Sequence, residues 1–195
     1  MTIGPIGRSL CGNHLRAMEH EWLVTNGIGG YASGTVCEAN TRRYHGLLVA
    51  ALDVAATPAS TEYPLATHEF ADGTIAPRGY LHLESFRLDK GVPVWRYAFA
   101  DLLLEKRLLM QPGHNTTLVS LELLRGKTAL QLELTPLCSS RDYHSHGRGG
   151  WHPCLREIPG GCEIEAYAGA QTYRLLCAGA RCTPDPDWHW KFRHR

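Results

Sequence analysis

Residues 40–50 read NTRRYHGLLVA and place four large polar side chains, Arg42, Arg43, Tyr44 and His45, directly ahead of an apolar run. Two guanidinium forks and two hydrogen-bonding rings suit hydroxyl-rich ligands and aromatic stacking, and they equally suit carboxylates across a domain interface. A structural alternative is that buried ion pairs fix a neighbouring loop to a sheet. Because buried charged forks usually have protein partners, we favour structural or interface contacts over direct ligand contact.

A second candidate is the glycine-rich stretch TNGIGGYASG, residues 25–34. Its Gly27-x-Gly29-x-x-Ala32 spacing formally matches a dinucleotide fingerprint. That fingerprint needs a following helix to hold the pyrophosphate, and residues 33–37 (SGTVC) have no helical pattern. We therefore expect a loop whose backbone approaches a neighbour closely or needs positive φ. The combined candidate site comprises Asn26, Gly27, Gly29, Gly30, Tyr31, Arg42, Arg43, Tyr44 and His45.

A histidine-rich stretch, residues 139–161, contains His144, His146, His152 and Cys154. Their spacing matches no common zinc pattern, and glycine-rich loops often carry histidines that bind nothing. The seven cysteines of the chain are odd in number and include no C-x-x-C pair. This usage favours neither a disulfide framework nor a zinc motif. We predict no metal and no cofactor.

The overall composition is that of an ordinary globular protein, with 195 residues, 44% hydrophobic and 20% charged. A chain of this length forms one domain, or one domain and part of a second. Its formal charge of +1 gives no electrostatic reason to expect nucleic acid or an anionic membrane as a partner. The first eleven residues contain no secretory signal pattern, so we expect a cytoplasmic protein.

Period-two alternation of apolar residues predicts a mainly antiparallel, all-β sandwich. Residues 118–135 alternate on both sides of a glycine turn and predict one hairpin, and residues 80–99 predict another. Trp95 falls among strand positions and is expected in the core. Further expected elements are strands in 101–111, 162–167 and 172–177, a helix over 13–23, and loops over 56–79 and 139–161.

The stretch EWLVTNGIGGYASGTVCEANTRRYHGLLVAAL, residues 21–52, resembles the signature of the amino-terminal domain of bacterial and archaeal glycogen debranching enzymes of the amylo-α-1,6-glucosidase type. The similarity covers nearly the whole chain. It continues through residues 7–12, 70–99, 104–126, 132–146 and 185–192.

This resemblance implies a β-sandwich, or super-sandwich, domain that precedes an α/α-barrel glucosidase domain. In the family, the barrel uses two carboxylates to hydrolyse α-1,6 branch points of glycogen. The sequence stops at WKFRHR, where the family continues into the barrel. We therefore expect an amino-terminal domain over residues 1–183 and the start of a linker over residues 184–195.

The same resemblance implies that this chain lacks the catalytic residues and that its partner is the missing barrel. Glycogen or a branched α-glucan is then the substrate of the complete glycoside hydrolase, within glycogen catabolism. The nine candidate residues become a domain interface or the rim of the neighbouring substrate site. The alternative function is a free-standing α-glucan-binding β-sandwich module.

Overall fold

The computed structural model describes residues 4–47, 50–58, 61–127, 129–142, 144–145, 150, 152–183 and 189–194, with only the backbone for 46–47 and 50–58. The chain divides into two compact units. The first unit is Met1–Leu137 with Lys191–Arg195, and the second unit is Cys138–Trp190. The predicted domain end at residue 183 stays a prediction, because residues 184–188 lie outside the described part.

Most of the described secondary structure is β-strand. The helical segments of the first unit are α1 (Arg8–Cys11), α2 (His14–Glu19) and the 3-10 helix η1 (Gly79–Leu81). Its strands are β1 (Ile6–Gly7), β2 (Glu21–Thr25), β3 (Tyr31–Thr35), β4 (Gly46–Leu47), β5 (Ala50–Pro58), β6 (Tyr63–Pro64), β7 (Thr67–Glu69), β8 (Ile75–Arg78), β9 (Leu83–Asp89), β10 (Val92–Phe99), β11 (Leu102–Met110), β12 (Thr117–Arg125) and β13 (Leu130–Cys138). The second unit holds β14 (Cys154–Ile158), β15 (Gly161–Glu165) and β16 (Tyr173–Leu176).

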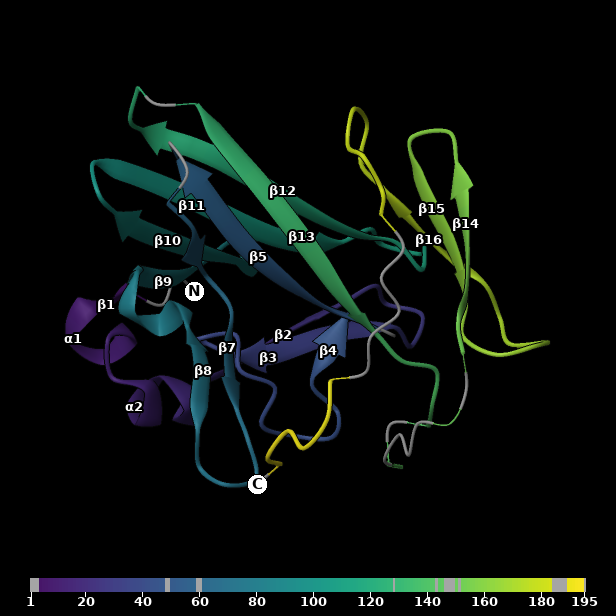
Figure 1. Cartoon of the computed structure of the whole chain (residues 1–195). Helices are drawn as coiled ribbons and strands as arrows, with labels where there is room; N and C mark the ends of the chain where they lie inside the picture. The colour runs from purple at the N-terminus through teal and green to yellow at the C-terminus, as the bar shows by residue number, and fades with distance from the viewer. Residues whose placement is uncertain are drawn as a thin grey trace. The chain divides into compact units, whose positions relative to one another are not determined.

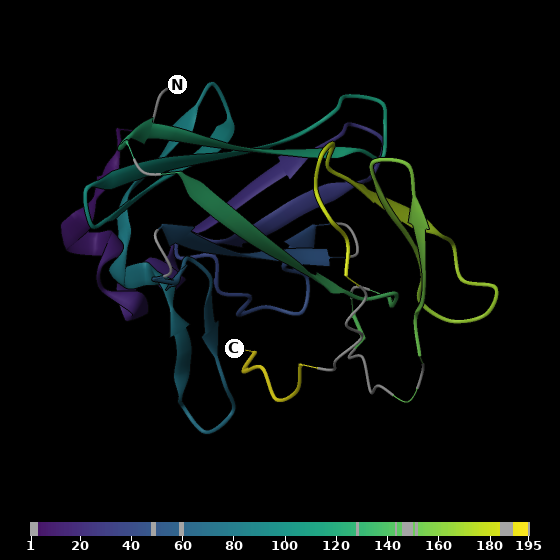
Figure 2. The same cartoon turned by 45° about the horizontal axis from the view of Figure 1, so that its top comes forward.

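Two antiparallel sheets form the sandwich of the first unit, which also holds the two-stranded β7–β8 sheet, and they confirm the all-β sandwich-like prediction (Figures 1 and 2). One sheet has the strand order β1-β9-β10-β11-β12, and the other has the order β13-β5-β4-β3-β2, with β6 paired to β5. Their facing side chains share one hydrophobic core. At its centre, the ring of Trp22 on β2 meets the ring of Trp95 on β10 edge to face, with centroids 5.2 Å apart.

The predicted hairpin around Asp89-Lys90-Gly91 is confirmed as β9–β10. Lys90 has φ +52° and Gly91 has φ +89°, the pair of positive φ angles that a tight two-residue turn between twisted strands favours. The next predicted strand is also confirmed, as β11, and Trp95 is fully buried as expected.

The predicted hairpin over residues 118–135 is wrong, although both of its strands exist. Strand β12 pairs with β11 in the first sheet, whereas β13 pairs with β5 in the second sheet. The chain crosses between the sheets at Gly126, which has φ +127° and lies against the side chain of Leu102. Alternation identifies a strand and its buried face, but it does not identify the strand's partner.

The predicted helix over residues 13–23 is only half right. Asn13 caps α2 by accepting a hydrogen bond from the backbone N–H of Arg16, and the helix ends at Glu19. Strand β2 then begins, because Trp22 reaches the core by pairing opposite Gly34 of β3. Pairing between sheets overrides local helix propensity here.

Two predicted loops contain strands. The stretch over residues 56–79 includes the β7–β8 hairpin, and the stretch over residues 139–161 includes β14. The predicted strands over residues 162–167 and 172–177 are confirmed as β15 and β16, which pair with each other and with β14.

The chain's last residues return to the β7–β8 hairpin (Figure 1). Phe192 bridges to Phe70, and Arg193 binds Glu69 through its backbone N–H at 2.8 Å and through its side chain at 3.2 Å. The Phe192 ring also lies 4.8 Å from the ring of His68, between centroids. Residues 191–194 therefore add a short segment to the first unit, in which Phe192 is half-buried and the other residues are exposed.

Candidate domain-interface site

The signature residues meet on the outer face of the sheet formed by β2 and β3. Glu21 begins β2 and points away from the core, since the alternate residue Trp22 fills the core. Its carboxylate receives three side chains of the 41–45 turn: Arg42 Nε at 3.0 Å, the Tyr44 hydroxyl at 3.3 Å and His45 Nε2 at 3.6 Å. The contact with His45 is longer than a hydrogen bond.

The 41–45 turn is held in place by buried polar contacts. His45 Nδ1 accepts hydrogen bonds from the backbone N–H groups of Thr41 at 3.1 Å and Arg42 at 3.3 Å. Ser33 on β3 donates its hydroxyl to the carbonyl of Tyr44 at 3.1 Å. The turn therefore lies against the sheet in one conformation and presents Tyr44, which is 44% exposed, outwards.

His45 is neutral in this arrangement. Because Nδ1 accepts, the proton of the neutral ring is on Nε2. Burial lowers the pKa of His45, and the carboxylate of Glu21 offsets this only in part. The buried Nε2–H has no hydrogen-bond partner among the described residues, although it faces the Glu21 carboxylate. The Glu21 carboxylate, 3.6 Å away, is therefore the acceptor toward which this buried donor points.

Glu21 is charged. Its partial burial would raise the pKa of the carboxyl, but the hydrogen bond from Arg42 and the charge of Arg42 outweigh burial and lower it. The hydrogen bond that Arg42 donates to Glu21 likewise raises the pKa of Arg42. The pair is therefore ionised, with side chains 42% exposed for Arg42 and 33% exposed for Glu21.

These exposures correct the expectation of buried arginine forks. Arg42 does pair with a carboxylate of its own domain, but the pair lies at the surface, and Arg43 is exposed. None of the three hydrogen bonds that fix the 41–45 turn to β3 and to its own backbone involves a guanidinium. Ser33 and His45 supply them instead.

Asn26 anchors the glycine-rich loop. Its side-chain oxygen accepts from the N–H groups of Ile28 at 3.0 Å and Gly30 at 2.8 Å. Its amide nitrogen donates to the carbonyl of His114 at 3.1 Å and to the side chain of Asn115 at 2.8 Å. All four hydrogen-bonding positions of this amide are used, so Asn26 has none left for a ligand.

The conformation of the same loop requires glycine at three positions. Gly27 and Gly29 have φ +79° and +102°, which side chains rarely adopt. A Cβ on Gly30 would lie 2.5 Å from the amide nitrogen of Asn26. The loop joins two antiparallel strands and precedes no helix, so it cannot hold a dinucleotide in the Rossmann manner. Tyr31 opens β3 opposite Thr25 and is half-buried.

The structure thus places eight of the nine predicted residues in two groups, and the ninth, Arg43, is exposed in the 41–45 turn. Arg42, Tyr44 and His45 converge on Glu21, whereas the 26–31 group builds the β2–β3 turn. Sequence reasoning placed Glu21 near the motif without assigning it to the site. Only the antiparallel register of β2 with β3 brings it beside the 41–45 turn, and no spacing along the chain indicates this.

A second polar cluster lies beneath the first, inside the sandwich. Lys106 points inwards from β11 and is 3% exposed, and its ammonium hydrogen-bonds Glu38 and lies 5.4 Å from the Trp95 ring centroid. The Tyr97 hydroxyl donates to the same carboxylate. Burial, then the charge of Glu38, raises the pKa of Tyr97 well above its usual value. Sequence analysis missed this network, because Lys106 occupies a position that alternation assigns to apolar residues.

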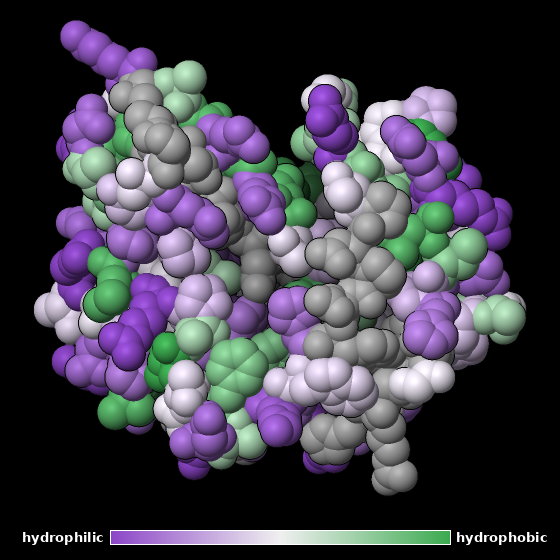
Figure 3. All heavy atoms as spheres, viewed as in Figure 1, coloured by the Kyte–Doolittle hydropathy of each residue, from purple (hydrophilic) through white to green (hydrophobic). Residues whose placement is uncertain are grey.

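No metal centre is found among the described residues, where no three histidine, cysteine or acidic side chains gather as ligands. His146, one of the four candidates weighed, lies outside the described residues. No helix in the described part of the chain is long and apolar enough to cross a membrane. On the face seen in Figure 3, hydrophobic residues form small groups between hydrophilic ones.

Comparison with known proteins gives one match. The family model described as the amino-terminal domain of glycogen debranching enzyme matches residues 20–195. No curated protein and no solved structure matches the chain. The family match covers both clusters and nearly the whole chain. The chain therefore belongs to the glycogen debranching enzyme amino-terminal domain family.

Proposed function

We propose that this chain is the non-catalytic amino-terminal domain of an amylo-α-1,6-glucosidase that hydrolyses α-1,6 branch points of glycogen in the cytoplasm. Its role is to support a catalytic α/α barrel carried outside these 195 residues. The outer β2–β3 face, with Glu21, Arg42, Tyr44 and His45, is the surface that contacts the barrel and borders its substrate site.

One observation carries this proposal: the signature residues build an ordered polar surface beside an exposed apolar residue. Arg42 and Tyr44 are partly exposed on the Glu21 carboxylate, and Leu23, two positions after Glu21 on the same face, is 60% exposed. A domain interface combines such an apolar residue with polar groups that find partners across it. The half-exposed ring of Tyr44 and the fork of Arg42 also suit a glucan at the rim.

Three acidic residues of the motif regions are already paired with cations within the chain. Glu21 pairs with Arg42, Glu38 with Lys106, and Glu69 with Arg193. Glycoside hydrolysis needs one carboxyl with a raised pKa and a second carboxylate facing it across the scissile bond. The pKa of Glu21 is lowered, which is the wrong direction for a general acid.

The test is glucose release from a branched limit dextrin. We expect none from the purified chain, and we expect hydrolysis once the barrel domain of a complete family enzyme is added in trans. Glucose release by the chain alone, abolished by replacing one of its acidic residues, would refute the proposal.

A free-standing α-glucan-binding module is the second candidate, favoured by the exposed Tyr44 ring beside Arg42. Electrophoresis of the chain through a glycogen-containing gel separates the two. Strong retardation that Tyr44→Ala removes, without any barrel present, would favour the binding module.

A further inference from the structure

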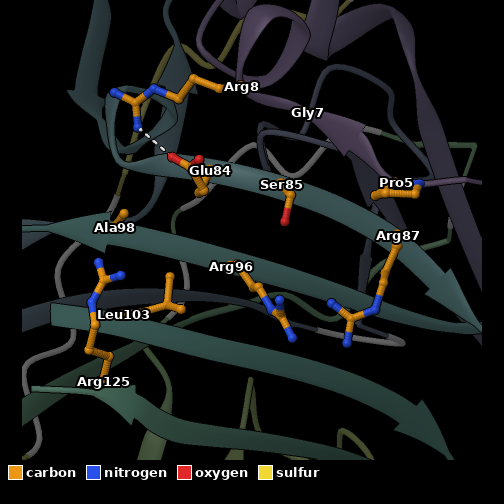
Figure 4. Close-up of a pocket in the computed structure, with 10 residues that line it drawn as sticks. All are labelled: Pro5, Gly7, Arg8, Glu84, Ser85, Arg87, Arg96, Ala98, Leu103 and Arg125. Atoms are coloured by element: carbon orange, nitrogen blue, oxygen red, sulfur yellow. Dashed lines mark hydrogen bonds and ion pairs between the residues drawn. The ribbon is translucent and has the colours of Figure 1, made fainter.

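A hollow of about 720 Å³ lies on the outer face of the five-stranded sheet, the face that turns away from the β2–β3 sheet (Figure 4). Four of its lining side chains are arginines, and one is a carboxylate. The arginines are Arg8, Arg87, Arg96 and Arg125, and the carboxylate is Glu84. A hollow of this volume falls within the range of small-molecule sites.

Two of these guanidinium groups converge on a single oxygen beneath the hollow. Arg87 Nη2 and Arg96 Nε lie 3.1 Å and 2.8 Å from Oε2 of Glu105, and Figure 4 shows the two arginine side chains pointing toward each other. Arg107 binds the other oxygen of Glu105 at 2.7 Å and also Asp89 at 3.1 Å. Glu105 itself is 3% exposed, so the arginine heads cover it.

Positive charge therefore exceeds negative charge around the hollow. Burial would raise the pKa of Glu105, but hydrogen bonds from Arg96, Arg87 and Arg107 lower it, and the group is ionised. With Arg107 balanced by Asp89, the four lining arginines face two carboxylates, Glu84 and Glu105. Among the described lining residues two positive charges remain without a partner charge, and Glu122, which lies opposite Glu105 on β12, is not part of the lining.

Several donors are also unused. The Arg125 side chain makes one hydrogen bond to a described residue, from Nε to the carbonyl of Asp101 at 3.3 Å. The one hydrogen bond that the Arg96 side chain makes to a described residue also uses Nε, and it goes to Glu105. The terminal N–H groups of both arginines thus have no protein acceptor in the described part of the chain, and guanidinium forks bind phosphate in two-point contacts.

We propose that this hollow binds a small-molecule phosphate monoester. The dianion neutralises the two excess charges and accepts hydrogen bonds from Arg96 and Arg125. Leu103, which lies between these arginines in Figure 4, and Ala98, which also lines the hollow, contact the carbon part of the ester. The proposal concerns a different sheet from the motif cluster and does not rest on the proposed function.

Titration calorimetry of the full chain at low salt tests it, with glycerol 3-phosphate as the probe and glycerol as its neutral counterpart. We expect saturable binding of the phosphate ester alone, weakened by added sodium chloride because the interaction is ionic. Arg125→Gln should weaken binding about tenfold, the effect of losing one charge-assisted hydrogen bond.

Arg78→Gln is the matched control. Arg78 is also exposed, also donates through Nε to a single backbone carbonyl, that of Ile75 at 3.5 Å, and does not line the hollow. Thermal melts verify that both variants fold. Equal weakening by both variants, equal binding of glycerol, or binding of a polyglutamate peptide without binding of glycerol 3-phosphate would each overturn the proposal.

Discussion

Among the clusters of the first unit in which one glutamate collects several donors, those of Glu21 and Glu38 differ in burial. Glu21 binds Arg42 and Tyr44 at the surface, whereas Glu38 binds Lys106 and Tyr97 inside the sandwich. An exposed pair competes with water, so removing it has little effect on folding. A buried pair leaves an uncompensated charge when one partner is lost. The buried cluster therefore stabilises the fold, and the surface cluster remains available for a partner.

The largest expected effect comes from the buried cluster. Lys106→Met should lower the free energy of unfolding by about 3–5 kcal/mol, because Glu38 keeps its charge without a counter-ion. Urea unfolding followed by tryptophan fluorescence measures this. The double variant with Glu38→Gln should recover much of the loss. An unchanged unfolding midpoint in Lys106→Met would show that the buried cluster contributes no more to stability than the surface cluster.

The second largest effect on stability is expected for Asn26, which anchors the glycine-rich loop. Asn26→Ala deletes four hydrogen bonds and leaves the Gly30 N–H without its acceptor, which should cost about 2–3 kcal/mol. Asn115→Ala, which removes one of the four, is the control and should cost less. Equal losses of stability in the two variants would show that Asn26 does not organise the loop.

A pH-dependent effect should come from His45. Its pKa is lowered in the folded protein, so the unfolded chain binds more protons below about pH 6.5. Its contribution to stability is therefore fully present above that pH and is lost as the pH falls. His45→Gln should flatten this part of the melting-temperature profile between pH 7.5 and pH 5. The pKa of His82 is also lowered by burial, so the melting temperature of the variant should still depend weakly on pH. An identical profile in His45→Gln would contradict the neutral, buried ring.

The smallest effect on folding is expected for Arg42. Arg42→Ala should leave the melting temperature nearly unchanged, since the side chain is 42% exposed and the turn is held by Ser33 and His45. In a complete enzyme with the same residues, it should raise KM or weaken the contact with the barrel. A melting temperature as low as that of Lys106→Met would place Arg42 with the buried cluster instead.

Local patterns predicted the strands well and their partners poorly. The β9–β10 hairpin follows from alternation and a turn whose two residues accept positive φ, so its prediction needed no distant contact. Strands β12 and β13 have equally clear alternation, yet they lie in different sheets. That choice depends on which sheet the second strand can reach after Gly126, and no residue near the turn encodes it.

The candidate site shows the same contrast between local signals and distant partners. The loop glycines and the 41–45 turn were visible in the sequence, because turn residues and clustered polar groups are local signals. The partners that give the polar groups their roles come from other strands, Glu21 from β2 and Lys106 from β11. Charged residues at inward positions of a strand are identified only when their burial is known.

The central claim, that the outer β2–β3 face is the contact surface for a glucosidase barrel, is tested most directly by one binding measurement. Calorimetry would compare the chain, its Leu23→Glu variant and its Leu176→Glu variant for binding to the barrel domain of a complete family enzyme. Leu23 is 60% exposed beside Glu21, and Leu176 is 69% exposed on β16, so the two changes are matched in exposure. We predict that Leu23→Glu abolishes binding and that Leu176→Glu leaves it intact. Unimpaired binding of Leu23→Glu would contradict the account.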